Sequence, residues 1–198
     1  IMSFTIRRAE AADGPALAAV YAPYTETGLT FESPAPTPEE FTARITDTLK
    51  GYPFLVCERD GRPVGYAYAH RHMERAAYQW NAELSVYLDR AVRRRGLGQR
   101  LYGALMELLT MQGVLTAHAL VTSPNPASQA LHTAMEFQLL AVQDRAGYKN
   151  GDWHDVLWYV RELSPRGASP LPPVPLDTLP RPQVEAVLAD FSGPLERP

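Results

Sequence analysis

Cysteine is nearly absent from this chain, since Cys57 is the single one among 198 residues. One thiol excludes an intrachain disulfide and a metal cage built from cysteines, and it fits a reducing compartment. The sequence also lacks a run of 18 apolar residues and a signal peptide at its start. We therefore expect a cytoplasmic protein that has no membrane partner.

An excess of positive charge is missing as well. The 19 lysines and arginines stand against 22 aspartates and glutamates, which gives a formal net charge of -3. Domains that bind nucleic acid are typically basic, so we expect no nucleic-acid partner, and any anion site has to come from a local cluster of cations. The remaining composition, 45% apolar and 21% charged, is that of an ordinary globular domain.

Strand-like and helix-like patterns alternate over the first 163 residues. Thr37 before a proline predicts a helix start, Asp13 predicts another, and Gly113 is placed as a C-cap. The predicted strands are 4–8, 54–57, 64–70, 80–88, 115–121, 137–142 and 156–160, and the predicted helices are 16–27, 38–50, 98–112 and 125–135. Because hairpin connections mix with helical crossovers, we expect an α/β fold with a mixed sheet.

The composition changes after Leu163, because nine of the last 35 residues are proline. Such a segment favours an extended, poorly ordered tail over 164–182. One or two helical turns are expected at 184–191, in a tail that is docked on the domain or left loose. We therefore divide the chain into a domain at 3–163 and a proline-rich C-terminal tail at 164–198.

A basic glycine turn, Arg-Arg-Arg-Gly-Leu-Gly-Gln at 93–99, lies between the strand 80–88 and the clearest helix. The first N–H groups of a helix are unpaired and carry partial positive charge, glycine lets the backbone approach a phosphate, and arginine adds charge-assisted hydrogen bonds. The spacing is neither that of a Rossmann fingerprint nor that of a Walker loop. The alternative is an ordinary surface turn whose arginines are solvated.

This strand–turn–helix arrangement resembles the coenzyme A motif of the GCN5-related N-acetyltransferases, the GNAT superfamily. The stretch RAAYQWNAELSVYL at 75–88 and the stretch GYKNGDWHDV at 147–156 resemble the phosphinothricin and methionine sulfoximine acetyltransferase group more specifically. The resemblance covers about 6–163. It implies a mixed, mostly antiparallel sheet of about six to seven strands flanked by about four helices. It also implies acetyl-CoA as co-substrate, no metal, and a homodimer.

The resemblance also implies which residues hold the cofactor. Backbone groups of Val86, Tyr87 and Leu88 would pair with the pantetheine arm. Arg94, Arg95, Gly96, Leu97, Gly98 and Gln99 would hold the pyrophosphate. Asn125 and Ser128 would contact the pantetheine, although Asn125 is equally an ordinary N-cap. The family usually has Leu-Gly-Phe or Leu-Gly-Tyr after that short helix, whereas this chain has Met135-Glu136-Phe137, so the helix exit is expected to differ in shape.

An amine attacks a thioester only when it is neutral, so the enzyme needs a base. Glu83, in an otherwise apolar strand, matches the catalytic glutamate of the family, and its alternative is a solvent-facing position. By resemblance, Arg75 and Tyr78 would contact an acidic group of the substrate, because an arginine fork suits a carboxylate or a phosphinate. Phe31 would form a wall of the amine pocket. The matching residues Lys149, Trp153 and His154 indicate a pocket edge or a dimer-contact hairpin.

The remaining histidines and the cysteine carry less information. His70 and His72 lack a third ligand with credible spacing for a metal site. His132 is interpreted as a surface or packing residue, and Cys57 as inert core. The sequence thus predicts direct transfer of an acetyl group from acetyl-CoA to the amine of a small amino-acid-like acid. The alternatives are another small amine, a protein N-terminus, a CoA-binding module without catalysis, and a nucleic-acid module.

Overall fold

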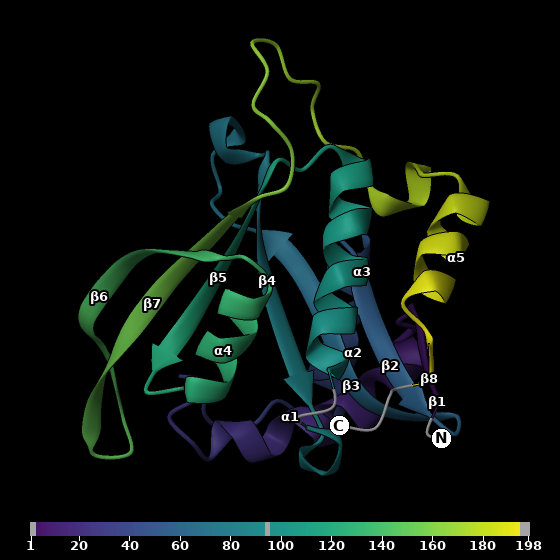
Figure 1. The fold of residues 1–198 in the computed structure, drawn as a ribbon. Helices are drawn as coiled ribbons and strands as arrows, with labels where there is room; N and C mark the ends of the chain where they lie inside the picture. Colours follow the sequence, from purple (N-terminus) through teal and green to yellow (C-terminus); the bar gives the residue numbers. More distant parts are fainter. Residues whose placement is uncertain (1–2, 94–95, 195–198) are drawn as a thin grey trace.

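One mixed β-sheet with helices on both faces forms the body of the protein (Figure 1). The computed structural model describes residues 3–93 and 96–194. The strands are β1 (Ser3–Arg8), β2 (Phe54–Arg59), β3 (Arg62–Arg71), β4 (Asn81–Leu88), β5 (Thr116–Ser123), β6 (Gln138–Lys149), β7 (Asp152–Glu162) and β8 (Gly193–Pro194). The helices are α1 (Gly14–Thr25), α2 (Pro38–Leu49), α3 (Leu97–Gln112), α4 (Pro126–Ala134) and α5 (Arg181–Asp190). The expected α/β fold is confirmed. Over the described residues, the structure has one strand and one helix more than expected, and these two elements, β8 and α5, both belong to the tail.

The strand order β6-β7-β5-β4-β3-β2-β1-β8 makes β4 and β5 central neighbours. These two strands run parallel, whereas the other paired strands of the described residues are antiparallel. Their ladder is short, because it ends at the pair Glu83↔His118 although β4 continues to Leu88 and β5 to Ser123. Beyond that pair the two strands diverge, as Figure 1 shows. The divergence leaves strand backbone in the middle of the sheet without a neighbouring strand.

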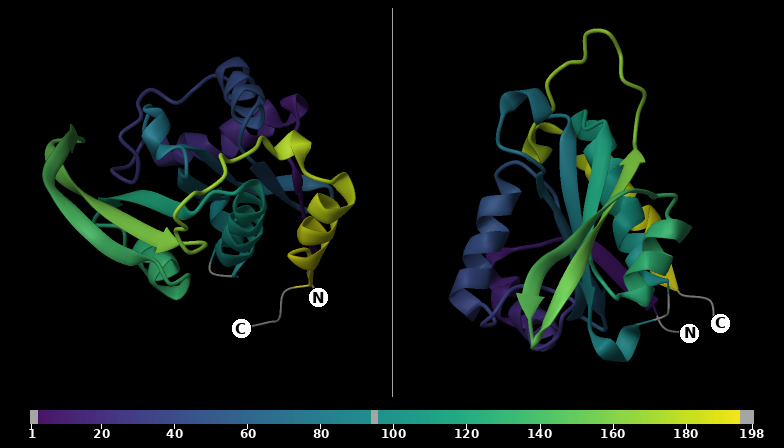
Figure 2. Two further views of the ribbon diagram at one scale, coloured as in Figure 1. Left: turned by 90° about the horizontal axis from the view of Figure 1, so that it is seen from above. Right: turned by 90° about the vertical axis from the view of Figure 1, so that its left-hand side faces the viewer.

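Helices α1 and α2 cover one face of the sheet, and α3 and α4 lie on the other (Figure 2). Two apolar clusters follow this division, one built on α1 and α2 and one built on α3. Side chains alternate across a strand, so Ala82 and Leu84 of β4 pack in the α3 cluster while Tyr87 packs in the α1–α2 cluster. Glu83 shares the parity of Tyr87 and therefore points to the α1–α2 face. None of the helices in the described residues has the length and apolar character that a membrane crossing requires.

Local sequence signals account for most helix ends. Thr37 accepts a hydrogen bond from the Glu40 N–H and forms a complete capping box with Glu40. Gly113 ends α3 in the left-handed conformation at φ 91°. The expected cap by Asp13 is wrong, because its side chain does not cap α1. The carboxylate instead accepts from the Glu10 N–H at 2.8 Å and from the Arg7 guanidinium at 2.7 and 2.8 Å.

The tail packs against the domain. It is free of regular secondary structure up to a short 3₁₀ turn at Leu176–Thr178, and α5 then begins before the expected start of the helix. Leu176, Val187 and Leu188 are buried in the cluster built on α3. The tail therefore docks on the domain through its apolar residues, which Figure 1 shows as the yellow segment beside α3.

The two strands of the β6–β7 hairpin are much longer than the strands predicted from the apolar residues of this segment. The sequence indicated 137–142 and 156–160, whereas the strands extend to Lys149 and begin again at Asp152. The two strands are joined by the Asn-Gly pair that is typical of a hairpin turn, with Asn150 at φ 54° and Gly151 at φ 85°. Most of β6 is exposed, so the hairpin arm lacks the alternation by which a half-buried strand is found in a sequence.

Candidate active site

The divergence of β4 and β5 exposes backbone hydrogen-bonding groups of β4. Hydrogen-bonded and non-hydrogen-bonded pairs alternate in an antiparallel ladder, and the Asp89 N–H donates to the Val64 carbonyl at 2.8 Å. By this alternation the backbone groups of Tyr87 belong to the ladder with β3, whereas those of Val86 and Leu88 face β5. Val86 and Leu88 lie beyond the last β4–β5 pair. Among the three residues expected at the pantetheine, these two present backbone to the opening.

Tyr24 reaches Leu88 from α1. Its hydroxyl donates to the Leu88 carbonyl at 2.7 Å and lies 3.2 Å from the Leu88 N–H. The N–H and carbonyl of Val86 are left without a strand partner within the described residues. On the β5 side, the buried Thr122 Oγ1 also has no hydrogen-bond partner in the described part of the chain. A buried polar atom without a partner is costly, so this edge is suited to a polar ligand.

The glycine turn has the backbone geometry of an anion site. Gly96 is the N-cap of α3 at φ 74° and has no side chain to occupy the first N–H groups of the helix. Gly98 is buried, and a Cβ added there would lie 3.4 Å from Leu131, so a larger residue would press on α4. Leu97 is fully buried and can offer only its backbone, and Gln99 is exposed. Arg94 and Arg95 lie outside the described residues.

Asn125 is the N-cap of α4, as one of its two interpretations held. Its side chain accepts from the Ser128 N–H at 3.2 Å. His132, one turn further along, is 2% exposed, bonds the Ser128 carbonyl at 2.7 Å and lies 3.3 Å from the Tyr102 hydroxyl. Burial lowers the pKa of His132, against the Ser128 hydrogen bond, which raises it. The packing interpretation of His132 therefore agrees with its burial.

Glu83 is flanked by two imidazoles from the end of β3. His72 Nδ1 lies 3.3 Å from Glu83 Oε2, and His70 Nε2 lies 3.8 Å from Glu83 Oε1. The Glu83 side chain is 21% exposed, so it is neither the solvent-facing residue of the alternative interpretation nor fully enclosed. A half-buried carboxylate beside donors is suited to hold and release a proton.

A stacked pair of histidines adjoins Glu83, and the sequence gave no reason to join its members. The rings of His72 and His118 are parallel within 2°, with centroids 4.0 Å apart. Burial lowers the pKa of His118 to about 4, and the nearby His72 and Arg166 act in the same direction. His118 Nε2 lies 2.9 Å from Asn81 Oδ1. His118 lies in a strand that was interpreted as buried, and the one signal that points to it is that it is the single titratable residue among 115–121.

The remaining candidate ligands are the two histidines at the end of β3 and the single cysteine. Within the described residues, no group of three or more His, Cys, Asp or Glu side chains is placed to hold a metal ion. Burial raises the pKa of the Cys57 thiol to about 12, with Arg100 acting against that rise and Glu58 adding to it. The thiol is fully buried, as expected for an inert core residue.

Arg75 and Tyr78 lie in the short 3₁₀ turn before β4. The Tyr78 N–H donates to the Arg75 carbonyl at 2.9 Å, and both side chains are exposed. The Tyr78 carbonyl accepts from Asn81 Nδ2 at 3.2 Å, and Asn81 in turn contacts His118. The turn that was expected to bind the acid group of the substrate is thus connected through Asn81 and His118 to the surroundings of Glu83.

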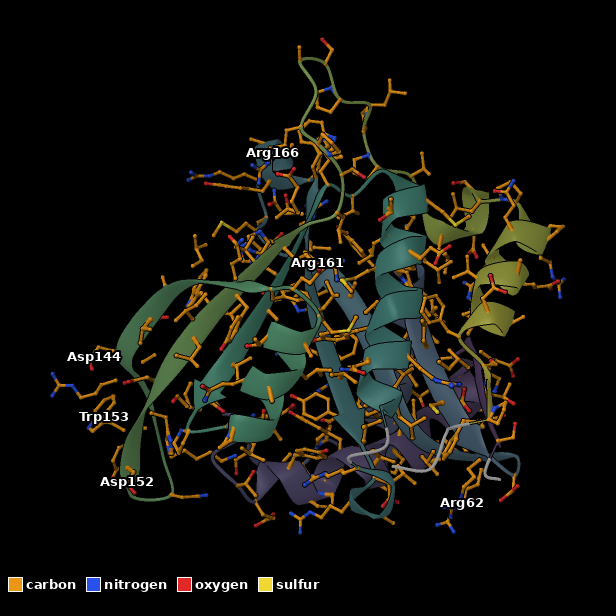
Figure 3. All side chains as sticks on the ribbon, in the orientation of Figure 1. Arg62, Asp144, Asp152, Trp153, Arg161 and Arg166 are labelled. Atoms are coloured by element: carbon orange, nitrogen blue, oxygen red, sulfur yellow. The ribbon has the colours of Figure 1, made fainter. Side chains whose placement is uncertain are left out.

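The loop that carries Phe31 is held by the β6–β7 hairpin. Lys149 Nζ donates to the carbonyls of Thr25, Thr30 and Glu32 at 2.6, 2.7 and 2.9 Å. Phe31 is 40% exposed and lies so close to residue 147 that a Cβ there would be 2.4 Å from its ring. Lys149 is therefore a structural clamp of this loop, whereas Trp153 points away from the body on the outside of the hairpin (Figure 3).

A cavity of about 340 Å³ opens beside this region on the α1–α2 face. Its walls are aromatic, with Tyr66, Tyr68 and Tyr87 from the sheet, and the Arg44 guanidinium and the His70 imidazole also line it. Arg44 also pairs with Glu32, and its guanidinium lowers the pKa of that carboxyl against the effect of burial. His70 both lines the cavity and faces Glu83, so the cavity adjoins the carboxylate.

Comparison with known proteins assigns this architecture. The model of the acetyltransferase (GNAT) domain matches residues 6–158. The chain is 36% identical over 172 residues to the phosphinothricin N-acetyltransferase of Streptomyces viridochromogenes, with 86% of this chain and 92% of that protein covered. It is 31% identical over 172 residues to the L-methionine sulfoximine/L-methionine sulfone acetyltransferase of Pseudomonas aeruginosa, with 85% and 100% covered.

A solved structure agrees with the sequence comparisons. The GNAT superfamily phosphinothricin acetyltransferase of Sinorhizobium meliloti, in complex with AcCoA, matches with a TM-score of 0.83 at 32% identity. The match covers 90% of this chain and 98% of that one. Together with the divergent central strands and the glycine turn, these matches show that the chain belongs to the GNAT family and is an acetyl-CoA-dependent N-acetyltransferase.

Proposed function

We propose that the enzyme acetylates the primary amine of a small amino-acid-like acid of the phosphinothricin, methionine sulfoximine or methionine sulfone type. One observation carries the proposal: the Arg75–Tyr78 turn and the Glu83 carboxylate lie at the same end of β4, joined through Asn81 and His118. An acid group on the turn would leave the neighbouring amine near the carboxylate. The activities of the relatives at 36% and 31% identity support this substrate class.

In this proposal Glu83 is the general base. It takes a proton from the ammonium, the free amine attacks the thioester carbonyl, and the tetrahedral intermediate collapses to the amide. As the carbon–sulfur bond breaks, the attacking nitrogen gives up its second proton and the leaving CoA thiolate takes up one, so that a neutral amide and the CoA thiol result. The unpartnered Val86 N–H is the proposed donor to the oxyanion, because a preorganised backbone N–H stabilises the charge that develops there.

Acetyl-CoA is proposed to lie along the β4 edge and over the start of α3. Val86 and Leu88 would contact the pantetheine with their backbone, while Tyr87 would line the site through its ring. The N–H groups of Leu97, Gly98 and Gln99, after the left-handed Gly96, would hold the pyrophosphate with Arg94 and Arg95. Asn125 and Ser128 at the start of α4 are proposed at the pantetheine, together with the unpaired Thr122 hydroxyl.

The test pairs Glu83→Gln with the control Glu107→Gln, which changes an exposed carboxylate on α3. Turnover is measured against amino acids and their phosphinate, sulfoximine and sulfone analogues. Removal of a general base costs about 10²- to 10⁴-fold, so E83Q should lose at least about 100-fold in kcat near neutral pH. E83Q should still be stabilised against heat by acetyl-CoA. Unchanged turnover in E83Q would remove Glu83 as the base.

The substrate class has its own test in Arg75→Gln. This variant should raise KM for acceptors with an acid group and leave KM for acetyl-CoA unchanged, because the guanidinium contacts only the acid group. Wild-type turnover of neutral amines or peptide N-termini in preference to amino-acid analogues would overturn the proposed class. Stabilisation by acetyl-CoA without turnover of any amine would instead favour a binding module.

We also propose that the protein forms a homodimer through the β6–β7 hairpin. The hairpin exposes five large apolar side chains, Leu139, Leu140, Val142, Tyr148 and Trp153, and exposed apolar side chains gathered on one element mark an interaction surface. Leu140→Asp should give a monomer in sedimentation, whereas Leu171→Asp, at an apolar residue that is 84% exposed elsewhere, should not. A monomeric wild-type protein would refute the proposal.

A further inference from the structure

Three side chains, those of Asn81, His118 and His72, connect the turn at 75–78 to Glu83 in an unbroken series of contacts. Asn81 Nδ2 donates to the Tyr78 carbonyl, and Asn81 Oδ1 contacts His118 Nε2 at 2.9 Å. His118 stacks on His72, whose Nδ1 lies 3.3 Å from Glu83 Oε2. The series therefore starts at the backbone of the turn and ends on one oxygen of the carboxylate.

The proton positions along this series follow from its fixed end. The Tyr78 carbonyl can only accept, so the Asn81 amide nitrogen faces it and the Asn81 oxygen faces His118. His118 Nε2 must then carry the proton, which leaves Nδ1 as an acceptor. That atom is buried and has no hydrogen-bond partner in the described residues. His118 is neutral at physiological pH, since burial holds its pKa at about 4.

His72 has a defined orientation for the same reason. A carboxylate only accepts hydrogen bonds, so Nδ1 of His72 carries the proton that faces Glu83 Oε2. The His72 side chain is 7% exposed, enclosed by the flat face of His118 and by the edge of Trp158, whose ring centroid is 5.9 Å away. A ring packed on two sides cannot rotate away from the carboxylate without losing both contacts.

His70 does not duplicate this contact. Its Nδ1 lies 2.8 Å from the Arg71 carbonyl and donates there, and its Nε2 is 3.8 Å from Glu83 Oε1, which is beyond hydrogen-bond distance. Oε1 is therefore the carboxylate oxygen without a hydrogen-bond donor among the described residues.

We propose that His72 is a positioning residue, which holds Glu83 through Oε2 so that Oε1 is free to take the proton of the acceptor amine. The stacked His118 and Asn81 tie this arrangement to the turn that carries Arg75 and Tyr78. The distance between the acid-binding turn and the base is thereby fixed before the substrate arrives, which is the condition for a near-attack geometry. This inference rests on the proposed function, in which Glu83 is the base.

Two substitutions separate the hydrogen bond from the packing. His72→Phe keeps a flat ring for the stack and removes the donor. His72→Asn places an amide nitrogen near the Nδ1 position and restores the donor without the ring. H72F should lower kcat about tenfold, with KM for acetyl-CoA changed by less than about twofold, and H72N should recover most of that loss. Glu107→Gln, which changes an exposed carboxylate on α3, is the control and should keep the wild-type kcat.

A second readout needs no acceptor substrate. ¹⁵N NMR of the histidine side chains in the full chain should show a proton on Nδ1 of His72, and a neutral His118 with its proton on Nε2. A His72 ring without a proton on Nδ1, or an H72F enzyme with wild-type kcat, would overturn the inference. If E83Q is as active as the wild type while the NMR result stands, the proposed base has failed and the contact network has not.

Discussion

Glu136 occupies a position where the backbone favours glycine. Two hydrogen bonds close the end of α4, from the Phe137 N–H to the His132 carbonyl at 2.9 Å and from the Glu136 N–H to the Thr133 carbonyl at 3.1 Å. This pair of bonds is the Schellman motif, whose central residue is left-handed. Glu136 has φ 60°. The helix exit thus keeps the glycine-type shape, contrary to the expected difference, and a residue with a Cβ adopts the left-handed conformation.

Replacing Glu136 should therefore change stability in a way that depends on the new residue. A left-handed residue with a Cβ costs roughly 1.5 kcal/mol, which glycine avoids. Glycine also has more freedom in the unfolded chain, and this lowers the stability of the folded state by about 0.5 kcal/mol. Glu136→Gly should consequently be about 1 kcal/mol more stable than Glu136→Ala. Both variants lose the contact with Arg161 at 3.2 Å, which is exposed on the glutamate side and is worth about 0.3 kcal/mol.

Urea unfolding of the wild type, E136G and E136A measures these differences. E136G should exceed the wild type by about 0.5 kcal/mol and E136A should fall slightly below it, with equal m values in all three. In thermal unfolding, 1 kcal/mol corresponds to roughly 2–4 °C for a chain of this size. If E136G is no more stable than E136A, the left-handed conformation carries no cost at this position and the reasoning fails.

Three further predictions concern the site. Lys149→Met should speed hydrogen exchange in the loop before α2 and lower the unfolding free energy by about 2 kcal/mol, because the Lys149 ammonium donates to three carbonyls. Equal exchange rates in the variant and the wild type would exclude a clamping role for Lys149. Gly147→Ala should displace Phe31 and raise the acceptor KM but not the acetyl-CoA KM, whereas Gly167→Ala, with open space around its Cβ, should match the wild type in steady-state kinetics. The pKa of His118 is about 4 in the folded protein and about 6.5 in the unfolded chain, so the unfolded state binds the proton first as the pH falls. The contribution of His118 to the unfolding free energy is therefore complete above pH 6.5 and falls toward pH 4, by about 3 kcal/mol at most. Urea unfolding of His118→Leu, measured across this pH range, should lack that dependence.

Local signals in the sequence predicted the elements with local causes. Thr37 and Gly113 mark helix ends because capping depends on residues within one turn. Asp60 and Gly61 form the Asp-Gly pair that is typical of a two-residue hairpin turn, and both have positive φ. The long β6–β7 arm has no such signal, because its exposure is decided by what packs against it.

The residues of the candidate site also divide into those that a sequence motif contains and those that only the folded structure brings together. The resemblance named Glu83, Arg75 and Tyr78, and the structure places them at one end of β4. It could not name His118, because its position beside His72 depends on the β4–β5 register, which pairs Glu83 with His118. Register is a property of strands that are distant in the sequence, so no motif contains it. The docking of the tail likewise depends on an apolar surface that exists only after the domain has folded.

The C-terminal tail covers one edge of the sheet and so affects which edge can pair with a strand of another molecule. β8 pairs with Ser3 and Phe4 on the outer side of β1, and the Ser192 hydroxyl accepts the next outward N–H, that of Ile6, at 2.8 Å. The β1 edge is therefore already hydrogen-bonded by the chain itself. On this side the outermost strand is β8, which has two residues and includes Pro194, whereas β6 at the other edge has twelve residues. Of the two edge strands in the described residues, β6 is therefore the one long enough to pair with a strand of another molecule, and a sheet that can extend at one edge alone resists fibre-like stacking.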